Sequence, residues 1–273
     1  MAQTDAQYEG LSYKLPELAH RYGKNVHILS DPLALTQLSR LSAKGVGQPL
    51  VNQLVTQLYR TLIHCVAAVE LPRITVRVRT RMIDVTPAGV WAGPMVDPDT
   101  RVVVTAVARA GVLPAQVIYD DLNLAMSPTQ VRQDYLALSR VTDDGGRVAG
   151  AQLGSAKIGG PISDAFVIIP DPMAATGSTL SAVLGCYSGA DAGRPKKILA
   201  LHLIVTPEYL RRVAEAHPEV EVYAFRLDRG LSPPDVLATV PGERWDDERG
   251  LTDNQYIVPG AGGLGEVMTN SYV

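Results

Sequence analysis

The stretch that decides the fold is VIIPDPMAATGSTL, residues 167–180. It opens with an apolar, β-branched run, which is typical of a buried parallel strand. A loop of small residues follows. Ser178 and Thr179, which come after Gly177, are favoured at a helix N-cap, and a helical pattern then continues through Leu184. The stretch therefore predicts a strand, a tight loop and the N-terminus of a helix.

This arrangement is suited to binding a phosphate group. The first N–H groups of a helix have no intrahelical acceptors and lie at the positive end of the helix dipole. The hydroxyl groups of Thr176, Ser178 and Thr179 can add donors. No Lys follows the glycine as in a Walker loop, and one glycine stands where the dinucleotide fingerprint has three. Asp171, at the carboxyl end of the strand, fits a ligand that also carries hydroxyl groups, as a sugar phosphate does.

Three motifs, in order along the chain, resemble those of the uracil phosphoribosyltransferases, a family with the type I phosphoribosyltransferase fold. Residues 171–179 (DPMAATGST) resemble the family's phosphoribosyl-pyrophosphate signature. Residues 256–262 (YIVPGAG) resemble its uracil-recognition segment, and residues 109–111 (RAG) its pyrophosphate-side loop. An ordinary strand, turn and helix would explain the first motif alone, but not the order of all three. The resemblance implies an α/β fold with a central, mostly parallel sheet flanked by helices, a flexible β-arm and a C-terminal base-recognition loop.

The resemblance also implies an activity and a set of site residues. The reaction would transfer the phosphoribosyl group of 5-phosphoribosyl 1-pyrophosphate to uracil or a related base, giving UMP and pyrophosphate. Arg109 and Asp171 would be the catalytic residues, with Arg109 on the diphosphate and Asp171 on the ribose hydroxyls. Mg²⁺ would be held mainly through the pyrophosphate, with no protein ligand assigned. The other implied substrate contacts are Pro172, Met173, Ala174, Ala175, Thr176, Gly177, Ser178, Thr179, Ile257, Gly262, Gly263 and Leu264.

The chain departs from the family pattern in three places. Gly263 stands where the family has a substrate-binding Asp, and Pro87 stands where it has a second Arg. Residues 152–157 replace the paired tyrosines of the family's mobile arm. Glu266 is close enough in sequence to restore the charge missing at Gly263. Three interpretations follow: a working uracil phosphoribosyltransferase with relocated groups, a phosphoribosyltransferase for another heterocycle, or a non-catalytic nucleotide-binding or regulatory relative.

The rest of the chain predicts one domain at residues 26–273, preceded by an N-terminal arm at residues 1–25. Strand and helix patterns alternate from Val102 to Arg226, which favours a parallel sheet with crossover helices. Residues 142–160, rich in Gly, Asp and Ser, are predicted to form a flexible arm over the site. A plain hairpin is the alternative, since Asp144-Gly145 is a hairpin-turn signal, and a flexible hairpin would satisfy both.

Towards the C-terminus, two further segments are predicted. Residues 231–254, rich in Pro and charged residues, are expected to form an excursion loop. Residues 256–258 are expected to form a short strand.

Composition sets the remaining expectations. The chain has 273 residues, of which 46% are hydrophobic, and a formal net charge of −3. This charge gives no electrostatic case for binding nucleic acid. Cys65 and Cys186 lie in apolar helical contexts and are expected to be buried thiols. Because the N-terminus is polar and no run approaches ~20 apolar residues, we expect a cytoplasmic protein without membrane partners. A homodimer or higher homo-oligomer is also expected.

Overall fold

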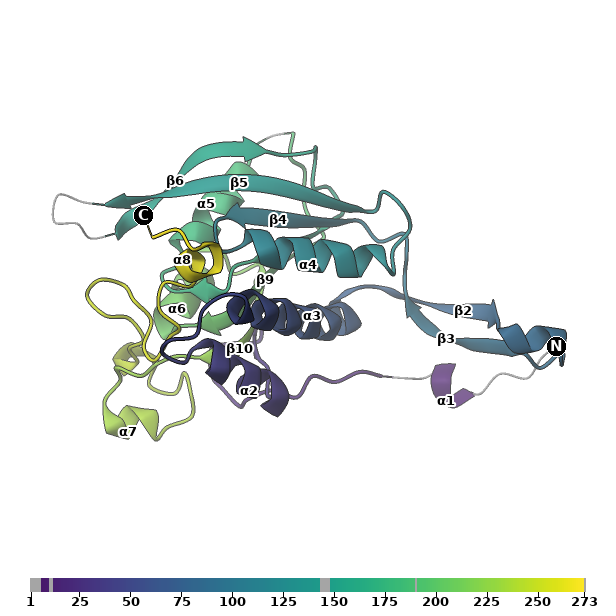
Figure 1. Ribbon diagram of the computed structural model, residues 1–273, viewed down its shortest axis with the longest axis horizontal. Coiled ribbons are helices and arrows are strands. Elements are labelled where there is room, and N and C mark those ends of the chain that lie inside the picture. The colour runs from purple at the N-terminus through teal and green to yellow at the C-terminus, as the bar shows by residue number, and fades with distance from the viewer. Residues whose placement is uncertain (1–5, 10–11, 143–147, 190, 273) are drawn as a thin grey trace.

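The computed structural model describes residues 6–9, 12–142, 148–189 and 191–272, and its centre is an eight-stranded sheet (Figure 1). The strand order is β1-β10-β9-β7-β4-β5-β6, and the short β8 pairs with β9. Neighbouring strands are parallel except for β5 and β6, which confirms the predicted α/β fold. The strands are β1 (Val26–Ile28), β4 (Val102–Ala108), β5 (Val131–Thr142), β6 (Val148–Lys157), β7 (Phe166–Pro170), β8 (Met173–Ala174), β9 (Lys197–Val205) and β10 (Val220–Leu227).

Helices cover both faces of this sheet (Figure 1). Alternate residues of a strand point to opposite faces, and β4 shows this clearly. Val102 and Val104 belong to a core shared with helices α2, α3, α4 and α8, whereas Val103 and Val107 belong to a core shared with α5 and α6. Because both faces are buried, the central strands are mostly apolar, and Thr105 of β4 and His202 of β9 are buried polar exceptions. The helices are α2 (Pro32–Leu41), α3 (Leu50–Glu70), α4 (Val112–Asn123), α5 (Ser178–Cys186), α6 (Pro207–Ala216) and α8 (Leu264–Thr269).

A two-stranded antiparallel hairpin projects from the body of the molecule (Figure 1). It consists of β2 (Arg73–Arg79) and β3 (Val90–Val96), with the 3-10 turn η1 (Arg81–Asp84) at its tip. Helix α1 (Ala6–Glu9), in the predicted N-terminal arm, lies beside the far end of this hairpin.

The predicted arm at residues 142–160 is the outer part of the antiparallel pair β5–β6. Residues 143–147, which include the predicted Asp144-Gly145 turn, lie outside the described part of the chain. The base of the arm is fixed by Asp134, whose fully buried carboxylate accepts hydrogen bonds from Arg132 (3.0 Å) and from the N–H of Gly159 (2.9 Å). Opening and closing of the arm stays a prediction.

The predicted excursion loop at residues 231–254 has its own internal structure. It contains α7 (Pro234–Leu237) and the 3-10 turn η2 (Trp245–Asp247), and it is organised around Glu248, which is 1% exposed. The Glu248 carboxylate accepts hydrogen bonds from Arg229 (2.7 Å), from the N–H of Gly242 (2.8 Å) and from the hydroxyl of Tyr22. A buried carboxylate requires such partners, so this segment is a packed unit.

Two expectations from composition can be compared with the structure. Cys65 and Cys186 are free thiols, and both are half-buried rather than buried. In the described ranges, no helix combines the length and the apolar character needed to cross a membrane.

Candidate active site

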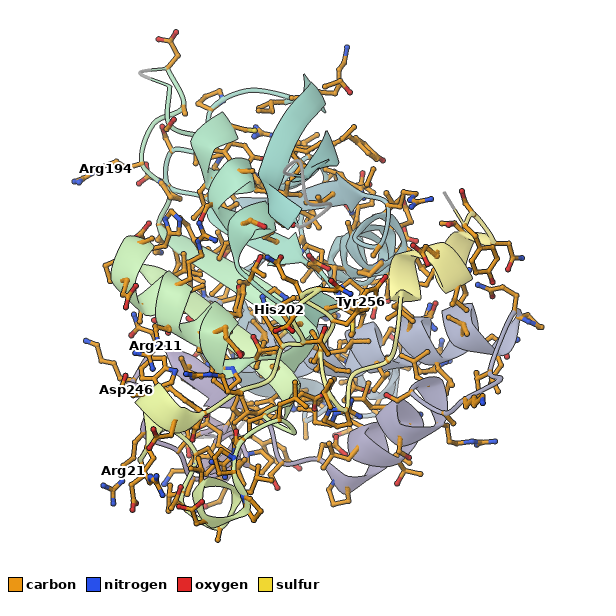
Figure 2. The ribbon with its side chains drawn as sticks, turned by 90° about the vertical axis from the view of Figure 1, so that its left-hand side faces the viewer. Arg21, Arg194, His202, Arg211, Asp246 and Tyr256 are labelled. Atoms are coloured by element: carbon orange, nitrogen blue, oxygen red, sulfur yellow. The ribbon has the colours of Figure 1, made fainter. Side chains whose placement is uncertain are left out.

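A cleft of about 540 Å³ opens at the carboxyl ends of β4, β7 and β9, the edge at which open α/β sheets bind ligands. Figure 2 views the molecule from this end, with His202 and Tyr256 near the centre of the picture. Every site residue implied by the sequence lines the cleft except Pro172. Pro172 is buried, and its carbonyl accepts hydrogen bonds from the N–H groups of Leu203 (3.2 Å) and Ile204 (3.1 Å), so it supports the loop from behind.

The loop from Asp171 to Ser178 joins β7 to helix α5 and forms one wall of the cleft. The predicted N-cap was wrong by one residue: Gly177 is the cap, and α5 begins at Ser178. Gly177 has φ +80°, which L side chains rarely adopt, and no side-chain hydrogen bond caps the helix. The hydroxyls of Thr176 and Ser178 are hydrogen-bonded at 3.0 Å. This wall therefore combines a helix N-terminus with two hydroxyl groups, as a phosphate site requires.

Two carbonyl groups of this loop accept hydrogen bonds from side chains of β9 and of the N-cap of α6. The carbonyl of Asp171 accepts a hydrogen bond from Nδ1 of His202 (2.7 Å), and the carbonyl of Ala175 accepts one from Oγ1 of Thr206 (2.6 Å). Since a carbonyl can only accept, Nδ1 of His202 carries the proton, and Nε2 accepts from the hydroxyl of Tyr209 (2.7 Å). Burial lowers the pKa of His202 to about 4, so the ring is neutral.

Sequence reasoning did not identify His202 or Tyr209, although both line the cleft. The available signal was that His202 interrupts the apolar run that follows Lys197 in β9.

Arg109 follows β4 directly and lies at the rim of the cleft. The peptide bond between Ala108 and Arg109 is cis. The Nη1 group of Arg109 donates hydrogen bonds to the carbonyl (3.1 Å) and to the hydroxyl (3.0 Å) of Ser271, close to the C-terminus. These bonds orient the guanidinium, which can make two parallel hydrogen bonds to a phosphate.

The base-recognition loop forms the opposite wall of the cleft. The strand predicted at residues 256–258 is absent there, since Ile257 forms only an isolated bridge with Leu251. The loop turns at Gly260, whose φ is +62°.

This turn is held by a buried ion pair that sequence reasoning missed. Asp228, 1% exposed, accepts hydrogen bonds from Arg226 (2.6 Å) and from the N–H of Gly260 (2.7 Å). Arg226 in turn donates to the Gly260 carbonyl (3.0 Å). Both backbone groups of Gly260 are therefore fixed by one ion pair, which makes the loop a rigid surface for a flat ligand.

Glu266 occupies the space beside Gly263, where the family pattern has a carboxylate. A Cβ atom built on Gly263 would lie 2.6 Å from Oε2 and 3.1 Å from Cδ of Glu266. Glu266 is the third residue of α8, and its side chain reaches back over the first turn into the lining of the cleft. Pro87, by contrast, lies in the exposed turn between η1 and β3 and is not among the described residues that line the cleft.

The family model for uracil phosphoribosyltransferase matches residues 28–243. A uracil phosphoribosyltransferase of Mycoplasma genitalium is 27% identical over 234 residues, which cover 86% of this chain and 93% of that protein. One from Thermococcus gammatolerans is 38% identical over 103 residues, or 38% of this chain and 36% of that protein.

Among solved structures, the AQ2163 protein from Aquifex aeolicus has the same fold. Its TM-score is 0.68 at 21% sequence identity, and the alignment covers 91% of this chain and 99% of that one. The family match spans most of the chain and includes the loop between β7 and α5 and the Arg109 loop. It confirms the resemblance seen in the sequence, and the chain belongs to the uracil phosphoribosyltransferase family.

Proposed function

We propose that this cleft transfers the phosphoribosyl group of 5-phosphoribosyl 1-pyrophosphate to uracil or a related base, giving UMP or its analogue and pyrophosphate. The observation that carries the proposal is the convergence of three distant segments in one cleft. They are the Arg109 loop, the loop from Asp171 to Thr179, and the segment from Ile257 to Glu266. Each suits a different part of the two substrates: the diphosphate, the ribose 5-phosphate and the base.

The chemistry follows from what these groups can bind. A nitrogen of the base attacks the anomeric carbon of the ribose, the bond from that carbon to the diphosphate oxygen breaks, and its electron pair leaves with the diphosphate. The proton of the attacking nitrogen passes to solvent. The N-terminus of α5 holds the 5′-phosphate, and Asp171 accepts hydrogen bonds from the ribose hydroxyls. Arg109 stabilises the charge that develops on the leaving group. Catalysis is then mainly positioning, without a protein nucleophile.

Glu266 is proposed as the carboxylate on the base side of the cleft. The supporting observation is its position: the carboxylate fills the place that a side chain on residue 263 would take. The departure at Gly263 is then a relocation of charge by one helical turn. This supports the first of the three interpretations, a working enzyme with relocated groups.

Mg²⁺ is proposed to enter with the diphosphate. Within the described ranges, no three His, Cys, Asp or Glu side chains are grouped to hold a metal, while Asp171 and Glu266 both line the cleft. One or two carboxylates together with substrate oxygens are a donor set that Mg²⁺ accepts. When bound, the ion would neutralise charge on the diphosphate.

Calorimetric titration separates the enzyme from a nucleotide sensor. We expect UMP to bind, and phosphoribosyl pyrophosphate to bind more tightly with Mg²⁺ than without it. Tight binding of UMP with no binding of phosphoribosyl pyrophosphate in either condition would favour the regulatory relative. The enzyme is preferred because Arg109 and Asp171 both line the cleft, and a sensor of a finished nucleotide has less need of a diphosphate-side arginine.

Homo-oligomerisation is proposed from the projecting hairpin β2–β3. Apolar side chains exposed on such an element are typical of an interface between subunits. Sedimentation equilibrium should give a mass above that of one chain, and Val85→Lys should lower it; a monomer at all concentrations would contradict this. The exposed apolar residues of the hairpin are Ile74, Val78, Met82, Val85, Trp91 and Met95.

A further inference from the structure

A buried polar pair lies directly beneath the ribose side of the cleft. His202 of β9 is 2% exposed and stands between apolar residues of the same strand. Its Nδ1–H donates to the Asp171 carbonyl, and its Nε2 accepts from the hydroxyl of Tyr209, each at 2.7 Å. Tyr209 is 2% exposed and belongs to the first turn of α6. The three residues form a chain of hydrogen bonds from α6 to the loop.

The backbone at Asp171 explains why a side-chain donor is needed there. β7 pairs with β9 as far as Pro170 opposite Leu201, and β8 resumes the pairing at Met173. Between them, Pro172 has no N–H group. The Asp171 N–H still donates to the Leu201 carbonyl (3.0 Å), but its carbonyl bonds to the His202 ring. This hydrogen bond is partly buried, and a carbonyl shielded from water is unfavourable without a donor, so His202 fixes the conformation of this turn.

The same turn of α6 also holds the other end of the loop. Thr206, the N-cap of α6, donates to the Ala175 carbonyl at 2.6 Å, and its hydroxyl accepts from the N–H of Tyr209 at 3.0 Å. The loop is thus fastened to α6 at Asp171 and at Ala175. The bond at Asp171 depends on the side chains of His202 and Tyr209, whereas the bond at Ala175 involves neither side chain.

We propose that His202 and Tyr209 are positioning residues for Asp171. By holding its carbonyl, they set the direction in which its carboxylate projects into the cleft towards the ribose hydroxyls. This inference rests on the proposed function, because it takes Asp171 as the group that binds the ribose. It assigns neither residue a contact with substrate or a role in the chemical step.

The test uses Tyr209→Phe and His202→Phe, with Tyr223→Phe as a matched control. Tyr223, in β10, is 1% exposed and its hydroxyl donates to the carboxylate of Glu70, and it is not among the described residues that line the cleft. With Mg²⁺ present, both test variants should bind phosphoribosyl pyrophosphate about 10-fold more weakly, the order expected for one weakened hydrogen bond. Their KM for the base should stay unchanged. The control should bind as the wild type does, even if its Tm falls.

A spectroscopic readout separates positioning from simple packing. Long-range ¹H–¹⁵N correlation of the imidazoles should show His202 with its proton on Nδ1 at neutral pH, assigned through the missing signal in His202→Phe. Tyr209→Phe should shift the Nε2 resonance, since that nitrogen loses its donor, and Tyr223→Phe should leave it in place. A proton on Nε2 in the wild type would overturn the inference.

The outcomes distinguish the inference from the proposed function. Asp171→Asn serves as the positive control and must weaken binding of phosphoribosyl pyrophosphate. If it does so while Tyr209→Phe and His202→Phe bind like the wild type, the positioning role is wrong and the proposed function stands. If the wild type itself binds no phosphoribosyl pyrophosphate, the proposed function fails, and the inference with it. If His202→Phe does not fold, the binding of phosphoribosyl pyrophosphate by Tyr209→Phe alone tests the inference.

Discussion

Glu266→Gln should damage the wild-type enzyme, whereas Gly263→Asp should not improve it. The Glu266 carboxylate already lies where a side chain on Gly263 would begin, with Oε2 2.6 Å from the position of the added Cβ. Glu266 must therefore move if Gly263 becomes Asp. Two carboxylates about 5 Å apart repel each other by about 1 kcal/mol in water and about 3 kcal/mol at an effective dielectric constant of roughly 20. The second charge is thus unfavourable in the free enzyme.

The size of the Glu266→Gln effect follows from the interaction that it removes. A hydrogen bond to a charged group contributes about 1.5–3 kcal/mol, which corresponds to a loss of roughly 10- to 100-fold in kcat/KM. The double variant Gly263→Asp, Glu266→Gln returns a single carboxylate to the family position and should recover most of this loss. The assay is release of pyrophosphate from phosphoribosyl pyrophosphate with uracil, and Glu215→Gln, at an exposed glutamate of α6, is the control.

Two results would refute this reasoning. Full turnover by Glu266→Gln would show that its carboxylate has no part in the reaction. A large gain from Gly263→Asp alone would show that Gly263 is an uncompensated gap in the site.

Thr176→Ala should weaken binding of ribose 5-phosphate by roughly 1–3 kcal/mol in calorimetry, and unchanged affinity would exclude a contact with the phosphate. Asp228→Asn should raise KM for the base more than KM for phosphoribosyl pyrophosphate, because it loosens the Gly260 turn; equal changes would contradict this. Burial lowers the pKa of His202 to about 4, so the unfolded state takes up a proton first as the pH falls. The contribution of neutral His202 to the free energy of unfolding is complete above about pH 6.5 and should fall by about 3 kcal/mol by pH 4. His202→Phe should lose that dependence in urea titrations, and an identical pH profile would refute the assignment. Limited proteolysis should cut residues 142–160 less when UMP is bound, and equal cutting would favour a static hairpin.

The parts of the fold set by local pattern were predictable from the sequence. The alternation of strand and helix patterns from Val102 to Arg226 was predictable, because mostly apolar runs such as those of β4 and β9 favour strands buried on both faces. The Gly177 cap was misplaced because Ser178 and Thr179 are the better N-cap residues, whereas the turn needs a positive φ.

Features that depend on tertiary contacts were not predictable. Glu248, in an acidic run, resembles a solvated residue, and only its packing against Arg229 and Tyr22 shows that it organises the excursion loop. In the same way, the role of Arg226 depends on Gly260, 34 residues later in the chain. Glu266 could be named from sequence, but the overlap of its carboxylate with the side-chain position of Gly263 required coordinates.

Pyrophosphate release, with uracil and a panel of other bases as acceptors, tests the proposed reaction most directly. With phosphoribosyl pyrophosphate and Mg²⁺, we expect one pyrophosphate for each nucleoside 5′-monophosphate formed, strict dependence on a pyrimidine-like base, and loss of both products in Asp171→Asn. The absence of turnover with every base, together with tight binding of UMP, would contradict the enzyme and identify the cleft as a nucleotide sensor.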